Sequence, residues 1–111
     1  MNRAREKLEA MLDEICETEG LKKPRTYRKL ARKEYLKLAK SKKRSRKQIR
    51  IAIRKQLQYL RLDIRYITEF VQKGAHLTSA QNELLNIVTT IYEQQRIMYE
   101  TNKRDLITYW G

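Results

Sequence analysis

A long stripe of apolar residues in the second half of the chain is the feature that most constrains its fold. Its members are spaced three or four residues apart throughout, as on one face of an amphipathic α-helix. They are Ile49, Ile53, Leu57, Leu60, Ile64, Ile67 and Val71. Ser45 and Gln48 match a capping box, and Gly74 can supply the left-handed residue that ends a helix. The pattern predicts one helix over 46–73, about 40 Å long.

The same predicted helix has a second apolar side. Its members are Tyr59, Leu62, Tyr66 and Phe70. Because two apolar sides need two neighbours, we expect this helix to lie inside a bundle or against a partner.

Three further helices are predicted around it. An acidic helix over 3–19 has its apolar face at Leu8, Met11, Leu12, Ile15 and Cys16, and Gly20 can end it. A basic helix over 27–40 follows Pro24, with Thr26 as its predicted cap and an apolar face at Tyr27, Leu30, Ala31, Tyr35 and Leu38. A helix over 79–101 begins after a capping box of Thr78 and Gln81, and its face contains Leu84, Ile87, Val88, Ile91, Gln95 and Met98.

These elements predict an all-α fold, an antiparallel helical hairpin or small bundle of about four helices. With 111 residues the chain supports a single helical unit over 1–111. The last part of this unit, 104–111, is a divergent tail. Three glycines and one proline leave few turns, which disfavours a fold of many short strands. No run of about 18 apolar residues exists, so we expect no membrane span.

Charge is distributed very unevenly along the chain. Residues 1–21 carry three basic and six acidic side chains, a net of −3, and residues 66–111 carry four and five, a net of −1. Residues 22–65, here called the basic block, carry nineteen basic side chains against only Glu34 and Asp63, a net of +17. Such a concentration of charge repels itself unless a polyanion or an acidic partner neutralises it. The basic block therefore predicts nucleic-acid binding first.

Basic side chains on both predicted basic helices and between them are the candidate phosphate contacts. On the long helix they form a stripe three, four or seven residues apart, about 27 Å in length: Lys47, Arg50, Arg54, Arg61 and Arg65. The preceding helix and loop supply Arg28, Lys29, Arg32, Lys33, Lys37, Lys40, Lys42, Lys43 and Arg44. Contacts of this kind give affinity without reading base sequence. A solvated helix face or an acidic membrane surface are the alternatives for this stripe. The tyrosines within the block fall on the apolar sides of their helices. We therefore expect them to pack within the fold, with stacking on unpaired bases as the alternative.

The sequence predicts neither an enzyme nor a metal or cofactor site. His76 and Cys16 are each the single residue of their type, and no glycine-rich phosphate loop exists. The carboxylates of the first helix are expected to form a solvated face; they are Glu6, Glu9, Asp13, Glu14, Glu17 and Glu19. A single cysteine fits a reducing compartment, so we expect a cytoplasmic, nucleoid-associated protein.

Three stretches carry a resemblance to a known family. The stretch KKPRTYRKLARKEYLKLAKSKKRSRKQIRIAIRKQLQYLRLDIRYI and the later IYEQQRIMYETNK resemble segments of prokaryotic insertion-sequence transposases of the insertion-sequence-five-like group. The opening AREKLEAMLDEIC is similar to the helix after that family's first catalytic aspartate. Together these cover roughly residues 4–103. The catalytic domain of that family is of the DDE, RNase-H-like type.

The resemblance implies that the chain is the helical segment between the first and second catalytic aspartates, or a truncated fragment that contains it. No position matches the three catalytic acids, so the expected function is non-catalytic binding of DNA, either transposon ends or any duplex. The intact transposase or a second copy of the chain are further expected partners. A stand-alone RNA-binding or ribosome-associated protein and a helical protein-interaction module are the alternatives.

Overall fold

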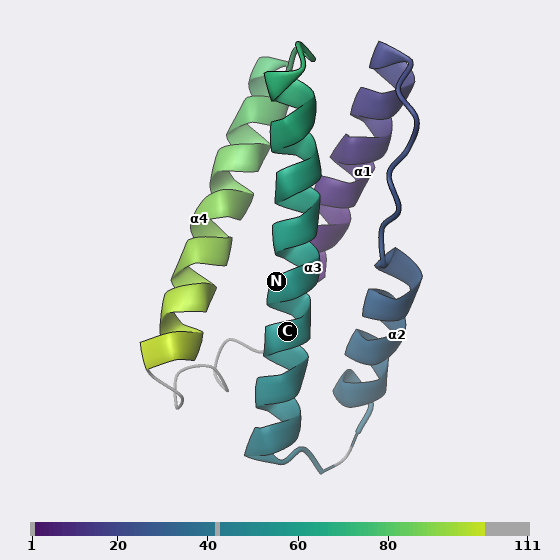
Figure 1. The fold of residues 1–111 in the computed structure, drawn as a ribbon. Coiled ribbons are helices and arrows are strands. Elements are labelled where there is room, and N and C mark those ends of the chain that lie inside the picture. Colours follow the sequence, from purple (N-terminus) through teal and green to yellow (C-terminus); the bar gives the residue numbers. More distant parts are fainter. Residues whose placement is uncertain (1, 42, 102–111) are drawn as a thin grey trace.

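The structure, a computed structural model, describes residues 2–41 and 43–101 and is all-helical over those ranges. Its helices are α1 (Asn2–Glu19), α2 (Arg28–Ala39), α3 (Arg46–Gln72) and α4 (Ser79–Thr101) (Figure 1). The all-α prediction is confirmed, and each helix begins and ends within one residue of its predicted bounds. The divergent tail at 104–111 lies outside the described residues.

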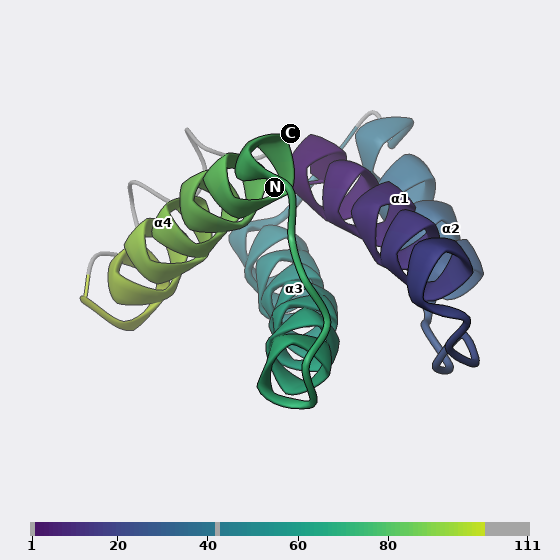
Figure 2. The same ribbon diagram turned by 90° about the horizontal axis from the view of Figure 1, so that it is seen from above.

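The long helix α3 is the centre of the bundle. It contacts each of the other three helices, and α1 also contacts α2 and α4. In Figure 1, α4 lies on one side of α3 and α2 on the other, and the view from above in Figure 2 shows the first turns of α1 and α4 next to each other on the same side of α3. Both predicted apolar sides of α3 have neighbours: Leu60 and Ile67 of the stripe pack against α1 and α4, while Tyr59 and Tyr66 of the second side contact α2 and the α1–α2 connection.

The local signals that bound α3 and α4 act as predicted. The Ser45 hydroxyl accepts a hydrogen bond from the Gln48 backbone N–H at 3.1 Å, and the Gln48 side chain accepts one from the Ser45 N–H at 3.0 Å. The reciprocal pair between Thr78 and Gln81 is formed at 3.1 and 2.9 Å. Gly74 has a φ of +106°, which an L side chain rarely adopts. These contacts satisfy backbone groups that the ends of helices leave unpaired.

Two apolar clusters make up the core. The larger joins α1, α3 and α4 through Leu8, Met11, Leu12, Ile15, Cys16, Leu60, Ile67, Ala75 and Val88. The smaller lies near the start of α3, where Ile49, Ile53 and Leu57 pack against Leu38, Tyr92, Met98 and Tyr99. The predicted stripe is thus buried or half-buried, except that Val71 is 41% exposed. Val71 lies in the last turn of α3, at the end of the bundle, where fewer neighbours surround the helix.

The start of α2 differs from its prediction. Thr26 does not cap the helix: the N-cap is Tyr27, whose side chain makes no capping hydrogen bond. The Thr26 hydroxyl instead accepts a hydrogen bond from Nε of Arg28 at 3.2 Å. The predicted cap is therefore wrong because a neighbouring guanidinium takes up its oxygen.

The apolar face of α2 is also narrower than predicted. Tyr27 and Leu30 are 43% and 46% exposed, and Ala31 is the one residue of α2 that is fully buried. The small side chain of Ala31 lets α3 approach closely enough for Gln56 Nε2 to donate to the Ala31 carbonyl at 3.3 Å. Because α2 is covered on one side only, Leu30 remains exposed, whereas Leu38 packs against the smaller apolar cluster.

On α4 the predicted face is partly correct. Val88 and Gln95 are buried, whereas Ile87, assigned to the same face, is 50% exposed. Ile87 precedes Val88 by one residue, so its side chain points about 100° away from the side that α1 and α3 cover.

Candidate nucleic-acid interface

Both acidic residues of the basic block are turned inward. Asp63 is 2% exposed on the face of α3 that packs against the other helices. The carboxylate of Glu34 is half-buried and accepts hydrogen bonds from Lys55 Nζ at 3.2 Å and from the Tyr59 hydroxyl at 2.9 Å. Over the described part of residues 22–65, every fully exposed ionisable side chain other than tyrosine is therefore a cation.

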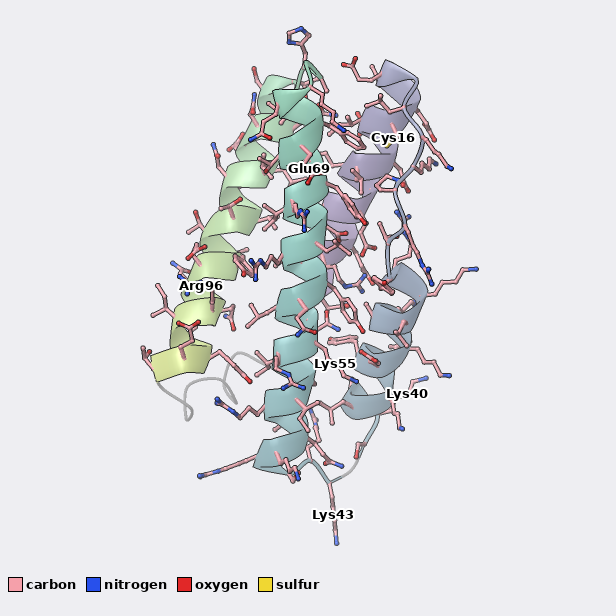
Figure 3. All side chains as sticks on the ribbon, viewed as in Figure 1. Cys16, Lys40, Lys43, Lys55, Glu69 and Arg96 are labelled. Atoms are coloured by element: carbon pink, nitrogen blue, oxygen red, sulfur yellow. The ribbon has the colours of Figure 1, made fainter. Side chains whose placement is uncertain are left out.

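The outer face of α2 carries most of the exposed candidates. They are Lys29, Arg32, Lys33, Lys37 and Lys40. Lys43 and Arg44 extend this surface through the α2–α3 connection, and Figure 3 shows Lys40 and Lys43 projecting from that end of the bundle. None of these side chains forms a salt bridge with a residue in the described ranges. The remaining candidate of the connection, Lys42, lies outside those ranges.

The stripe on α3 divides into exposed and engaged residues. Lys47, Arg54 and Arg61 are exposed and have no carboxylate partner within residues 2–41 and 43–101. The Arg50 guanidinium lies 4.2 Å from the centre of the Tyr99 ring and donates to the Tyr99 carbonyl at 3.4 Å. Arg65 pairs with Glu69 at 3.0 Å on the surface. Arg50 and Arg65 are thus partly occupied, and the first three residues form the open part of the stripe.

Arg28 differs from the other candidates, because it bridges α2 to α1. Its Nη1 and Nη2 atoms donate to the two carboxylate oxygens of Asp13 at 2.7 and 2.9 Å. Its Nε also lies 3.9 Å from Oε2 of Glu9. The hydrogen bond from Arg28 lowers the pKa of Asp13, and the same bond raises the pKa of Arg28. Arg28 is held within the fold, so we leave it out of the interface.

Beneath Arg28 lies a group of charged and polar side chains, here called the buried charge cluster. Its members are Arg5, Glu9, Asp13, Arg28, Gln56 and Asp63. Nη1 of Arg5, which is 1% exposed, donates to Glu9 Oε1 at 2.8 Å, and its Nε donates to Gln56 Oε1 at 3.3 Å. Glu9 itself is 5% exposed. The expectation that Glu9 and Asp13 belong to a solvated face is therefore wrong, because paired guanidinium groups draw them into the α1–α2–α3 junction.

Asp63 is the cluster member with the most perturbed titration. Burial, followed by the negative charge of Glu9 and a hydrogen bond with it, raises the pKa of Asp63 to about 8. Its Oδ2 atom has no hydrogen-bond partner in the described part of the chain. A carboxyl in such a place stays protonated at neutral pH, so two guanidinium groups of the cluster face two carboxylates, those of Glu9 and Asp13.

Sequence analysis missed this cluster, although one signal was present. Arg5 precedes Leu8 by three residues, and Asp63 lies three after Leu60 and four before Ile67. Both therefore fall on the apolar stripes of their helices, where a charged side chain must find a partner.

The tyrosines of the basic block are engaged mainly within the fold. Burial, then hydrogen bonding to Glu34, raises the pKa of Tyr59 to about 12. The Tyr66 hydroxyl donates to the Arg25 carbonyl at 2.9 Å. Tyr27 is the exposed one, with its ring centre 6.1 Å from that of Tyr59. Of these three tyrosines, only Tyr27 is therefore exposed enough to stack on a base beside the exposed cations.

Residues 2–41 and 43–101 contain neither a metal-binding cluster nor a membrane-spanning helix. No group of three or more histidine, cysteine or acidic side chains is arranged to hold a metal ion. No helix there is both long and apolar enough to cross a membrane.

Comparison with protein-family models, curated proteins and solved structures gives no match to this chain.

Proposed function

We propose that this protein binds the sugar-phosphate backbone of duplex DNA through a basic surface on α2, the α2–α3 connection and α3 as far as Arg61. The residues of this basic surface are Lys29, Arg32, Lys33, Lys37, Lys40, Lys43, Arg44, Lys47, Arg54 and Arg61. One observation carries the proposal: of the two acids of the basic block, Asp63 is buried and Glu34 is paired with Lys55, so neither neutralises a residue of this surface. A solvated helix face normally mixes both signs of charge, whereas this one presents cations alone.

The geometry suits contacts with a phosphate backbone. Lys47 and Arg61 are fourteen residues apart on one continuous helix, which places them about 21 Å apart along its axis. Several phosphates of a duplex lie within that length, and each one neutralised releases condensed counterions. Since phosphate contacts carry no sequence information, the proposed activity is binding with little sequence preference. The role is one of binding and not of catalysis.

The test is the salt dependence of binding to a fluorescent duplex, measured by anisotropy. A plot of log affinity against log salt concentration should fall by about 0.9 per contacted phosphate. The double variant Lys29→Gln/Lys33→Gln should reduce the slope by about 1.8. The matched control is Lys7→Gln/Lys73→Gln, which removes two exposed lysines from α1 and the end of α3 and should leave the slope unchanged.

Other outcomes would redirect the proposal. A slope near zero would remove the electrostatic account altogether. A structured RNA that displaces duplex DNA at equal phosphate concentration would instead support the RNA-binding alternative. A tight complex with an acidic protein at high salt, without DNA binding, would favour an interaction module.

We also propose that the chain derives from an insertion-sequence transposase of the DDE type. The support is the resemblance of two stretches, one containing KPRTYRK and one containing YEQQ, in the family's order. Translating the genomic DNA on both sides of the reading frame in all frames tests this origin. Catalytic-domain sequence in the flanks would support it, and unrelated genes on both sides would contradict it.

A further inference from the structure

A groove between α2 and α3 opens beside the basic surface. Its volume is about 640 Å³, within the range of about 300–1,000 Å³ typical of small-ligand sites. Its apolar wall is formed by Leu38, Ile51 and Ala52. Three lysines also line it, Lys37, Lys40 and Lys55, together with one acid, Glu34. Figure 3 shows Lys40 and Lys55 on opposite sides of the space between the two helices.

The apolar wall is unusual for a surface of this charge. Ile51 is 38% exposed, although it lies among cations in the most basic part of the chain. Its place on α3 is away from the apolar stripe, so the core does not need it. Phosphate contacts use cations alone, and they leave an apolar wall unexplained.

The cations of the groove differ in how firmly they are held. The carboxylate of Glu34 accepts a hydrogen bond from Lys55 at 3.2 Å and is itself held by the Tyr59 hydroxyl. An ammonium group has three donors, so Lys55 keeps two for a ligand. Lys37 and Lys40 are exposed and also line the outer face of α2. A strand that follows the basic surface therefore reaches the groove without a break in positive charge.

We propose that the groove takes one unpaired nucleotide of the bound nucleic acid, with its base against Leu38, Ile51 and Ala52 and its phosphate at the lysines. A nucleotide joins a flat, largely apolar base to an anionic phosphate. The groove offers an apolar wall for the first and lysines for the second. Base pairing and stacking hide that face within a duplex, so the ligand is a single-stranded end or gap. This inference rests on the proposed DNA binding and names the form of DNA that the groove prefers.

The test compares two DNA probes with equal numbers of phosphates. One is a duplex with a short single-stranded thymidine overhang, and the other is a fully paired blunt duplex. Anisotropy at one salt concentration should show about tenfold tighter binding of the overhang probe, the scale of effect expected from burying one base face against an aliphatic wall. Ile51→Ser should abolish this preference while leaving the affinity for the blunt duplex within twofold.

Ile87→Ser is the matched control, because Ile87 is 50% exposed on α4, outside the groove. It should retain the overhang preference, and circular dichroism of both variants should match that of the unaltered chain. Equal binding of the two probes with a normal salt slope would overturn the groove proposal alone. No salt-dependent binding of either probe would overturn the proposed function as well. A leucine-containing acidic peptide that binds the groove, with no overhang preference for DNA, would assign the groove to a protein partner instead.

Discussion

The buried charge cluster and the basic surface are neighbours on α2, yet they use similar side chains in opposite ways. Arg28 opens the helix with both terminal nitrogens on Asp13, whereas Lys29, Arg32 and Lys33 directly after it have no carboxylate partner in the described part of the chain. In the cluster, cations are matched to anions within the fold. On the surface they have no carboxylate partner among the described residues. The comparison shows that the placement of the few acids, and not the number of cations, separates the paired cations from the unpaired ones.

The two regions should also differ in what they contribute to stability. A buried ion pair contributes little net free energy when intact, but removing one partner leaves a charge that water cannot reach. Removing the charge of an exposed cation changes the free energy of unfolding little. Substitutions that break this contrast can be ordered by the size of the effect expected.

The largest effect is expected from an acid placed in the core without a counter-ion. Leu60 is fully buried one turn before Asp63, and Leu60→Asp should destabilise the fold by more than about 4 kcal/mol. Far-ultraviolet circular dichroism should show a largely unfolded chain. Gln58→Asp, at an exposed position of the same helix, should keep normal helicity. Unchanged melting of Leu60→Asp would refute α3 as the centre of the core.

Loss of the central cation of the cluster should be next in size. Arg5→Met removes the guanidinium that lies 2.8 Å from the buried Glu9 and leaves only that of Arg28 at 3.9 Å. It should lower the free energy of unfolding by about 3–5 kcal/mol. Urea denaturation measures this change. Arg3→Met, at an exposed position two residues earlier, should stay within about 0.5 kcal/mol. Equal stability of the two variants would mean that the cluster is not a structural element.

Asp63 predicts how the stability of the fold depends on pH. Its pKa is about 8 in the folded chain against an ordinary value of 3.8. The stabilisation is therefore complete below about pH 4 and is lost as pH rises through about 8. Between pH 6 and 8 the free energy of unfolding should fall by about 2 kcal/mol, at up to about 1.4 kcal/mol per pH unit.

Asp63→Asn should remove this fall, as urea denaturation at several pH values would show. The lowered pKa of Asp13 acts in the opposite direction, since its contribution is lost as pH falls into the acid range. The window from pH 6 to 8 therefore isolates Asp63. A wild-type chain whose stability does not change across that window would contradict the protonated carboxyl.

The smallest effects should separate the two kinds of cation most clearly. Arg28→Gln should lower the free energy of unfolding by about 1 kcal/mol, because its bond to Asp13 is only partly shielded from water, and should leave the salt slope of DNA binding unchanged. Arg32→Gln should do the reverse, with stability within about 0.5 kcal/mol and a slope smaller by about 0.9. If both variants changed the slope equally, Arg28 would belong to the interface after all.

Much of the fold could be predicted from the sequence, because its signals are local. The capping boxes at Ser45 and Thr78 and the left-handed glycine at Gly74 each act within a few residues. The stripe on α3 repeats often enough to fix a helical face from Ile49 to Ile67. Such features form within one helix and its ends, so they depend little on the tertiary arrangement of the four helices.

The features that sequence analysis missed all depend on contacts between distant segments. Arg5 meets Gln56 across 51 residues, and no count of apolar spacing identifies that pairing. The exposure of Leu30 follows from how few neighbours α2 has, which its own sequence does not contain. The candidate cations were identified as a set, but only the position of Asp13 singles out Arg28 as structural.

The single thiol of the chain gives a direct view of how α1 separates from the bundle. Cys16 is 2% exposed in the larger apolar cluster, and burial, followed by the negative charge of Asp13, raises its pKa. A thiol in that state reacts with an alkylating reagent only after α1 lifts away and lets it ionise. Since the sequence has one cysteine, the modified fraction counts those openings without any engineered label. The rate of Cys16 modification can be compared with and without DNA. The comparison would show whether DNA on the basic surface makes the opening of α1 rarer or more frequent.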